Sequence, residues 1–174
     1  GEDLRVLRAV QIAVDEGLAL PILVGRTAVI EANIKKLGLR LENGVNITIV
    51  DQEHNPDYEQ FSDEYHAIMQ RKGVTPEYAQ REARRRSTLI AAMLVKFNKA
   101  DGMLCGTYSS YDIHLDFVKN IIGLKEGRKN LFTLNALMLE DRNLFIADTY
   151  INRNPTAEQL AEMTILAAEE VRRF

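Results

Sequence analysis

One segment, residues 102–118, has the side chains and the spacing of a ligand site at the end of a strand. The apolar run 103–105 is followed by Gly106 and a polar stretch, after which Asp112 opens an apolar-periodic segment. This order predicts strand, glycine, polar loop and helix. In an open α/β sheet such a loop lies where ligands bind, and the N–H groups that open the next helix favour an anion. The candidate contacts are the hydroxyls of Thr107, Ser109, Ser110 and Tyr111.

The same spacing also suits a simple strand-to-helix turn with Asp112 as its N-cap, and the sequence leaves both interpretations open. Cys105 lies in the apolar run, so we expect a small buried hydrophobe rather than a nucleophile. A single cysteine cannot form an internal disulfide, which fits a reducing cytoplasm. The histidines at 54, 66 and 114 share no metal-ligand spacing with it, so no metal site is expected.

The composition is that of an ordinary globular chain. It has 174 residues, a net charge of -3 and 46% hydrophobic residues, which suits one domain or slightly more with a real core. The basic cluster Arg81–Arg86 is local and is expected to be a solvated helix face, so charge does not indicate nucleic-acid binding. No apolar run approaches the roughly 20 residues of a membrane helix, and the first residues are charged. We therefore expect a cytoplasmic protein.

Helical periodicity alternates with short apolar runs along the chain. Helices are expected over 3–17, 27–37, 58–72, 76–85, 88–98, 112–122 and 156–174, strands over 20–24, 45–50 and 103–105, and a hairpin from 131–139 and 143–147. This alternation predicts an α/β fold with a mainly parallel sheet, divided into a first lobe, 1–128, and the start of a second lobe, 129–174. A helix comes first, and the last helix has no strand after it. We expect a piece of a larger α/β unit.

Local signals predict several helix ends. Thr27 suits the cap of the second helix, and Gly38 its stop. Thr75 and Pro76 form a start signal, and Thr156 with Gln159 forms a capping box before the last helix.

Five segments, spread along the whole chain in order, resemble one family. They are GEDLRVLRAV at the start, LPILVG at 20–25, RKGVTPEYA from Arg71, DGMLCGTYSS from Asp101 and FIADTYINRNPTAEQLAE from Phe145. Together they resemble the phosphate acetyl/butyryltransferase family, in the version fused behind the catalytic region of bacterial NADP-dependent malic enzymes. The resemblance implies a three-layer α/β/α, isocitrate/isopropylmalate dehydrogenase-like (phosphotransacetylase) fold. It also implies that this chain is incomplete, with the family's acyl-transfer serine, arginine and aspartate beyond Phe174.

The resemblance suggests which arginines could meet an acyl-CoA or a phosphate. In the stand-alone transferases, arginines hold the phosphate and the CoA phosphates while the CoA thiol attacks an acyl phosphate. Arg5 matches one such position, although a helix-surface arginine is the alternative. A second position falls on Met69, with Arg71 nearby as a substitute, and a third, after the serine-rich loop, has no arginine. His114 cannot replace a planar arginine fork, and we expect it to pack or face solvent rather than act as a base.

The resemblance therefore implies a non-catalytic acetyl-CoA-binding regulatory and oligomerisation module of an NADP-dependent malic enzyme, which decarboxylates malate to pyruvate. No cofactor is expected in this segment, because NADP and a divalent metal would be held by the malic enzyme region of the same polypeptide. An active phosphate acetyltransferase or butyryltransferase is the alternative. The hairpin 131–147 suits a subunit contact of a homo-oligomer or a core element. Asp148, Thr149 and Asn152 suit a hydrogen-bonded turn better than a cleft.

Overall fold

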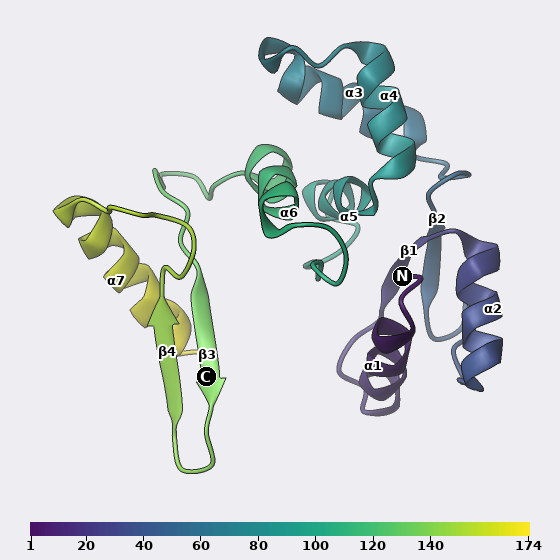
Figure 1. Cartoon of the computed structure of the whole chain (residues 1–174), viewed down its shortest axis with the longest axis horizontal. Helices are drawn as coiled ribbons and strands as arrows, with labels where there is room; N and C mark the ends of the chain where they lie inside the picture. Colours follow the sequence, from purple (N-terminus) through teal and green to yellow (C-terminus); the bar gives the residue numbers. More distant parts are fainter. The chain divides into compact units, whose positions relative to one another are not determined.

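The computed structural model describes residues 1–174 and divides them into two compact units, Gly1–Gly123 and Leu124–Phe174 (Figure 1). The first unit contains α1 (Leu4–Asp15), β1 (Ile22–Gly25), α2 (Thr27–Leu37), β2 (Thr48–Asp51), α3 (Tyr58–Met69), the 3-10 turn η1 (Gln70–Lys72), α4 (Pro76–Arg85), α5 (Ser87–Lys96), α6 (Tyr111–Phe117) and the π-helix η2 (Val118–Ile122). The second contains β3 (Leu134–Met138), β4 (Asn143–Ala147) and α7 (Ala157–Val171). None of the helices combines the length and the apolar composition needed to cross a bilayer.

β1 and β2 form a parallel pair in the first unit. Their register runs from Ile22 opposite Thr48 to Gly25 opposite Asp51, with α2 as the crossover that parallel neighbours require. An apolar cluster packs beside these strands. Its buried side chains come from α1, β1, α2 and the segment that precedes β2: Leu7, Leu23, Ile30, Ile34, Leu41 and Ile47. The predicted α/β class with a parallel sheet is confirmed.

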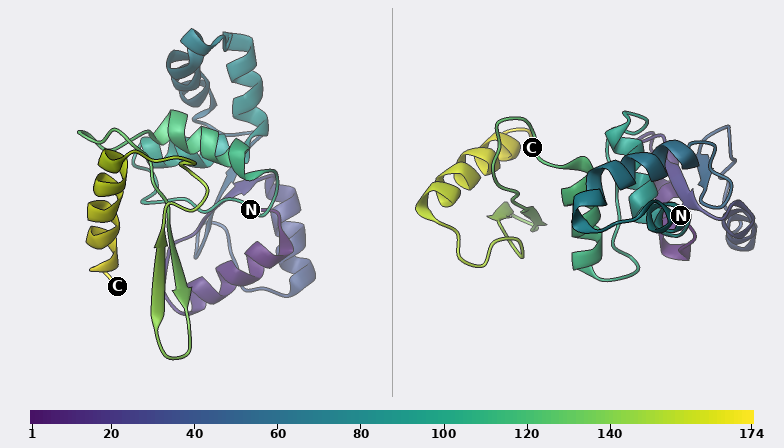
Figure 2. Two further views of the ribbon diagram at one scale, coloured as in Figure 1. Left: turned by 60° about the vertical axis from the view of Figure 1, so that its left-hand side comes forward. Right: turned by 90° about the horizontal axis from the view of Figure 1, so that it is seen from above.

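A helical layer completes the first unit. α3 and α4 lie side by side (Figure 2), and α5 contacts β1, α4, α6 and η2. Its position explains why α5 is apolar on nearly every face. The buried side chains of this layer include Phe61, Tyr65, Leu89, Ile90, Met93 and Phe117.

Local signals in the sequence set several helix ends. Thr75 accepts a hydrogen bond from the N–H of Tyr78 and Pro76 opens α4, as predicted. α2 stops at Gly38, whose φ of 63° is left-handed and whose N–H donates to the carbonyl of Lys35. These ends depend on residues within one turn, which is why the sequence alone predicts them.

The predicted strand over 103–105 is wrong. These residues are irregular, and both Leu104 and Cys105 are exposed, so the expected burial of the cysteine is wrong as well. A strand is stabilised by ladder hydrogen bonds to a neighbour, and the parallel sheet of this unit is limited to β1 and β2. A run of three apolar residues does not form a strand by itself.

The helix expected over 112–122 begins one residue earlier and changes type within its length. Ser110, rather than Asp112, occupies the N-cap position, and its side chain makes no capping hydrogen bond. α6 passes at Val118 into the π-helix η2, which ends at Gly123. The predicted cap is wrong because Tyr111 already has helical geometry and places Asp112 inside the first turn.

The second unit consists of a hairpin and a helix. β3 and β4 pair antiparallel from Leu134 opposite Ala147 to Met138 opposite Asn143, which confirms the hairpin. α7 begins with the predicted capping box, in which Thr156 and Gln159 bond each other's backbone N–H. No residue from 124 to 174 is buried within this unit. The apolar side chains of the hairpin and of α7 are therefore incompletely covered.

Candidate functional site

The carboxyl ends of β1 and β2 meet at the edge of the sheet where ligands bind in open α/β folds. Gly25 and Asp51 end the two strands opposite each other. The chain then passes through Arg26 into α2, whose first residue is Thr27. Arg26 and Asp51 therefore place charged side chains at this edge, and Glu2, from the segment before α1, reaches it by bonding Arg26.

The Asp51 carboxylate caps α2 from the neighbouring strand. It accepts hydrogen bonds from the N–H groups of Thr27 at 2.9 Å, Glu53 at 2.8 Å and His54 at 3.2 Å. These bonds, those of Thr27 foremost, hold the pKa of Asp51 well below its ordinary value. The sequence suggested Thr27 itself as the cap, and that interpretation is wrong: Arg26 is the N-cap residue and the capping side chain comes from β2.

We expect Asp51→Ala to lower the free energy of unfolding by about 1–2 kcal/mol at neutral pH, because it removes a cap. The native pKa of Asp51 lies below the ordinary value of 3.8, so its contribution is complete above that pH and is lost as the pH falls through the native pKa. Urea unfolding at neutral and at strongly acidic pH measures the difference. Asp51→Asn is the matched control, since it keeps an acceptor but cannot ionise. A difference between wild type and Asp51→Ala that is as large at strongly acidic pH as at neutral pH would contradict this account.

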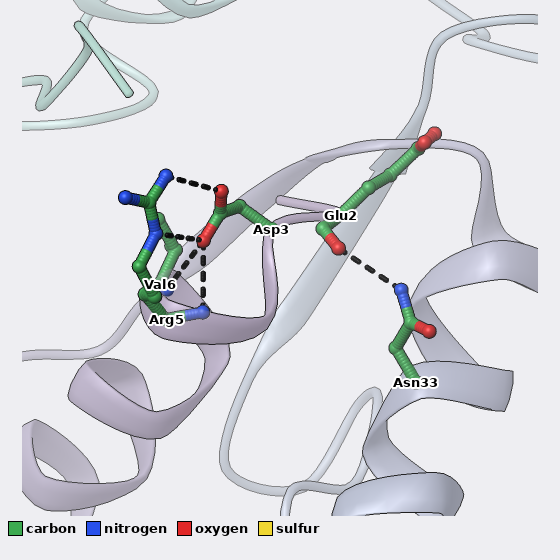
Figure 3. A network of polar contacts seen from close by, with 5 residues as sticks. All are labelled: Glu2, Asp3, Arg5, Val6 and Asn33. Carbon is green, nitrogen blue, oxygen red and sulfur yellow. Dashed lines mark hydrogen bonds and ion pairs between the residues drawn. The ribbon is translucent and has the colours of Figure 1, made fainter. Parts of the chain in front are cut away.

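Arg5, the arginine matched by family resemblance, lies at the start of α1 (Figure 3). Asp3 caps this helix by accepting from the N–H groups of Arg5 at 2.8 Å and Val6 at 3.3 Å. The Nε and Nη2 atoms of Arg5 donate to the same carboxylate, at 3.2 and 2.9 Å, and hold the pKa of Asp3 well below its ordinary value. The Arg5 side chain is 75% exposed. Its guanidinium is held at the surface, where an incoming anion must compete with Asp3.

A second arginine, Arg26, lies at the end of β1 and was missed by the sequence analysis. Its N–H, Nε and Nη2 donate to the Glu2 carboxylate at 2.9, 2.9 and 2.8 Å, and these bonds lower the pKa of Glu2 to about 2. The backbone carbonyl of Glu2 accepts from Asn33 on α2 (Figure 3). These contacts fix the segment before α1 to α2. The available signal was an arginine directly after a strand-ending glycine.

The hydroxyl loop, residues 106–111, lies on the surface of the first unit. Thr107, Ser109 and Ser110 are exposed, and Tyr111 is the first residue of α6. Ser109 has a φ of 75°, which is left-handed. Ser110 is the N-cap residue of α6, and its side chain makes no capping hydrogen bond. The predicted hydroxyls thus lie on neighbouring exposed residues, and their role as ligand contacts stays a prediction.

Arg71 lies in η1 and is exposed, without a hydrogen bond or an ion pair. Its neighbour Lys72 donates to the side chain of Asn120 on η2 at 2.6 Å. No hydrogen bond or ion pair joins Arg5 or Arg71 to the hydroxyl loop. The predicted site residues thus form three separate groups, on α1, on η1 and on the loop.

A surface depression of about 420 Å³ lies beside α2 and the segment 39–43. Its lining includes Glu31, Lys35 and Ile49 and none of the predicted ligand residues. It therefore adds nothing to the loop and arginine groups.

Comparisons with known proteins match the chain along its whole length. It is 49% identical over 174 residues to the NADP-dependent malic enzymes of Haemophilus influenzae and Escherichia coli, and 32% identical to the phosphate acetyltransferase of Nitratidesulfovibrio vulgaris. In each case all of this chain is covered but only 23–24% of the relative, so the chain spans about a quarter of their length. The EutD phosphotransacetylase from Staphylococcus aureus shares the fold, with a TM-score of 0.77 at 23% identity over 92% of this chain and 47% of that one.

The sequence profile of one family, described as Phosphate acetyl/butaryl transferase, matches residues 1–174. This match covers both compact units, including the arginine at the start of α1 and the hydroxyl loop before α6. The predicted resemblance is confirmed, and the chain belongs to the phosphate acetyl/butaryl transferase family.

Proposed function

We propose that this chain is part of the C-terminal phosphotransacetylase-like domain of an NADP-dependent malic enzyme, and that it binds acetyl-CoA or a related acyl-CoA as a regulatory ligand. The observation that carries the proposal is the level of identity. It is 49% to two NADP-dependent malic enzymes and 32% to a phosphate acetyltransferase, over the same 174 residues. In this proposal, malate decarboxylation with NADP and a divalent metal takes place in the catalytic region of the same polypeptide.

The exposed groups of the first unit suit the chemistry of an acyl-CoA. Its phosphates are anions, which the guanidinium groups of Arg5 and Arg71 can bind through paired hydrogen bonds. Its amides and thioester offer acceptors and donors to hydroxyls such as those of Thr107 and Ser110. The proposed ligand contacts are therefore Arg5, Arg71 and the hydroxyl loop.

The same geometry supports binding rather than acyl transfer. The resemblance implies a further phosphate-binding arginine after the serine-rich loop, and this chain has none there. Both ring nitrogens of His114 are within hydrogen-bonding distance of protein oxygens, so the ring offers no free base to deprotonate a thiol. A site of this kind can hold an acyl-CoA without the arginine clamp and the base that acyl phosphate chemistry needs.

Titration of the full-length protein with acetyl-CoA tests the proposal. We expect binding by calorimetry and a changed rate of malate oxidation at subsaturating malate. Because the linkage of binding affinities is reciprocal, malate should change the affinity for acetyl-CoA by the same factor by which acetyl-CoA changes the affinity for malate. Acetyl-CoA that neither binds nor alters malate turnover would refute the proposal.

An active phosphate acetyltransferase or butyryltransferase is the second candidate, favoured by the 32% identity to a phosphate acetyltransferase. It predicts that the full-length protein forms acetyl or butyryl phosphate from the acyl-CoA and inorganic phosphate. The regulatory proposal predicts binding of acetyl-CoA without this product. A direct assay for acyl phosphate separates the two.

The second unit supports a further element of the proposal, contact between copies of the protein. Met138 on the hairpin and Ile165 on α7 are 74% and 58% exposed, and no side chain of the unit is buried. Because the chain spans about a quarter of its relatives' length, such apolar surface is expected to be covered either by the rest of the polypeptide or by a second copy, and we propose the second copy. Light scattering of the full-length protein should give the mass of a dimer or a larger assembly.

A further inference from the structure

The imidazole of His114 joins the hydroxyl loop to α5. Its Nδ1 lies 2.8 Å from the hydroxyl oxygen of Thr88, and its Nε2 lies 2.5 Å from the backbone carbonyl oxygen of Tyr108. Thr88 is buried, at 7% exposed, in the helix with the most buried side chains. One end of the imidazole is therefore anchored in the core, and the other holds the middle of the loop.

The chemistry of the two partners assigns the hydrogens. A carbonyl oxygen only accepts, so Nε2 of His114 must carry the hydrogen that it donates to Tyr108. A hydroxyl both donates and accepts, so Thr88 satisfies Nδ1 whether that nitrogen is bare or protonated. Each ring nitrogen of His114 therefore has one hydrogen-bond partner, and neither nitrogen is left for a third group.

The loop has few other means of holding its shape. Residues 102–109 contain no helix or strand, and Leu104 and Tyr108 are almost wholly exposed. Ser109, the next residue, is held at a φ of 75°, a conformation that non-glycine residues adopt only where their surroundings enforce it. The bond from His114 to the carbonyl of Tyr108 acts directly before this residue.

We infer that His114 is a positioning residue that fixes the hydroxyls of Thr107, Ser109 and Ser110 for the acyl-CoA, without contacting that ligand itself. The inference rests on the proposed function for the identity of the ligand. The anchoring of the loop to α5 does not depend on it and is observable in the free protein.

Two amide substitutions separate the two contacts in the full-length protein. The amide nitrogen of His114→Gln reaches the position of Nε2 and can still donate to Tyr108, whereas the shorter His114→Asn reaches only as far as Nδ1 and Thr88. We expect His114→Asn to speed chymotrypsin cleavage after the exposed Leu104 and Tyr108 by about tenfold, because the loop opens more often, and to weaken acetyl-CoA binding by a similar factor, as for one lost hydrogen bond. His114→Gln should stay near wild type in both measurements.

The state of the loop and the affinity for acetyl-CoA, measured together, separate a failure of the anchoring role from a failure of the proposed function. An unchanged rate of chymotrypsin cleavage in His114→Asn without ligand would overturn the anchoring role, whatever the affinity for acetyl-CoA. An equal loss of affinity in His114→Gln and His114→Asn, with the loop still protected from cleavage in His114→Gln, would show that the ring contacts the ligand and would also overturn the inference. Faster cleavage of His114→Asn, in a protein whose wild type binds no acetyl-CoA, would refute the proposed function and leave the anchoring of the loop confirmed.

Discussion

Replacing Phe61 with alanine should lower the free energy of unfolding by about 3–5 kcal/mol, the range for an aromatic side chain deleted from a core. Phe61 is fully buried on α3, and its ring stacks on Phe97 with centroids 5.7 Å apart and planes 6° from parallel. Lys99 lies over the same ring at 5.9 Å. The deletion leaves a cavity that this packed layer can fill only in part.

Native-state hydrogen exchange of α5 amides in the full-length protein measures this effect within the unit that contains Phe61. Phe174→Ala is the matched control, because that ring contacts Phe145 but is 84% exposed. We expect the control to leave the α5 amides unchanged. Equal protection of α5 in wild type and Phe61→Ala would contradict the packing described for this layer.

Replacing Arg5 with glutamine should weaken acetyl-CoA binding by the full-length protein about ten- to a hundredfold. The estimate follows from the loss of a charge-assisted hydrogen bond to a phosphate, which contributes about 1.5–3 kcal/mol. Asp3 still caps α1 in this variant through its bonds to backbone N–H groups. Calorimetric titration then reports the loss of the guanidinium rather than the loss of the helix.

Two further variants make the Arg5 measurement specific. Arg5→Lys keeps the charge without the planar fork and should fall between wild type and Arg5→Gln. Arg8→Gln removes an exposed charge one turn further along the same helix and should bind acetyl-CoA as wild type does. Equal losses at both positions would point to a general field effect, and unchanged binding in Arg5→Gln would leave Arg5 as a helix-surface arginine.

The sequence predicted those parts of the fold that depend on neighbours within a few residues. Thr75 and Pro76, Gly38, and the capping box at Thr156 each act within one helical turn, and all are where the sequence places them. The hairpin over 134–147 is similarly local. The strand over 103–105 failed because pairing needs a partner from elsewhere in the chain, and a short apolar run carries no information about one.

In the candidate site, too, the sequence predicts single residues and short segments but not the contacts between distant residues. Contiguous hydroxyls at 107–111 could be found from spacing, and Arg5 from resemblance. The contacts that organise them join residues far apart: Glu2 to Arg26, Asp51 to Thr27 and Thr88 to His114 are 24, 24 and 26 residues apart. No periodicity or cap signal encodes such pairs, since they arise only when the strands and helices are assembled. His114 was therefore expected to pack or face solvent, and its two bonds came from the structure.

Because Cys105 is exposed, it can be labelled chemically. It is the one cysteine among these 174 residues, and it lies two positions before Thr107. A thiol-reactive, environment-sensitive fluorophore would attach beside the hydroxyl loop and report its surroundings as acetyl-CoA is added. The same accessibility would let two molecules cross-link by air oxidation, so mass measurements on this protein need a reductant to separate true association from a covalent artefact.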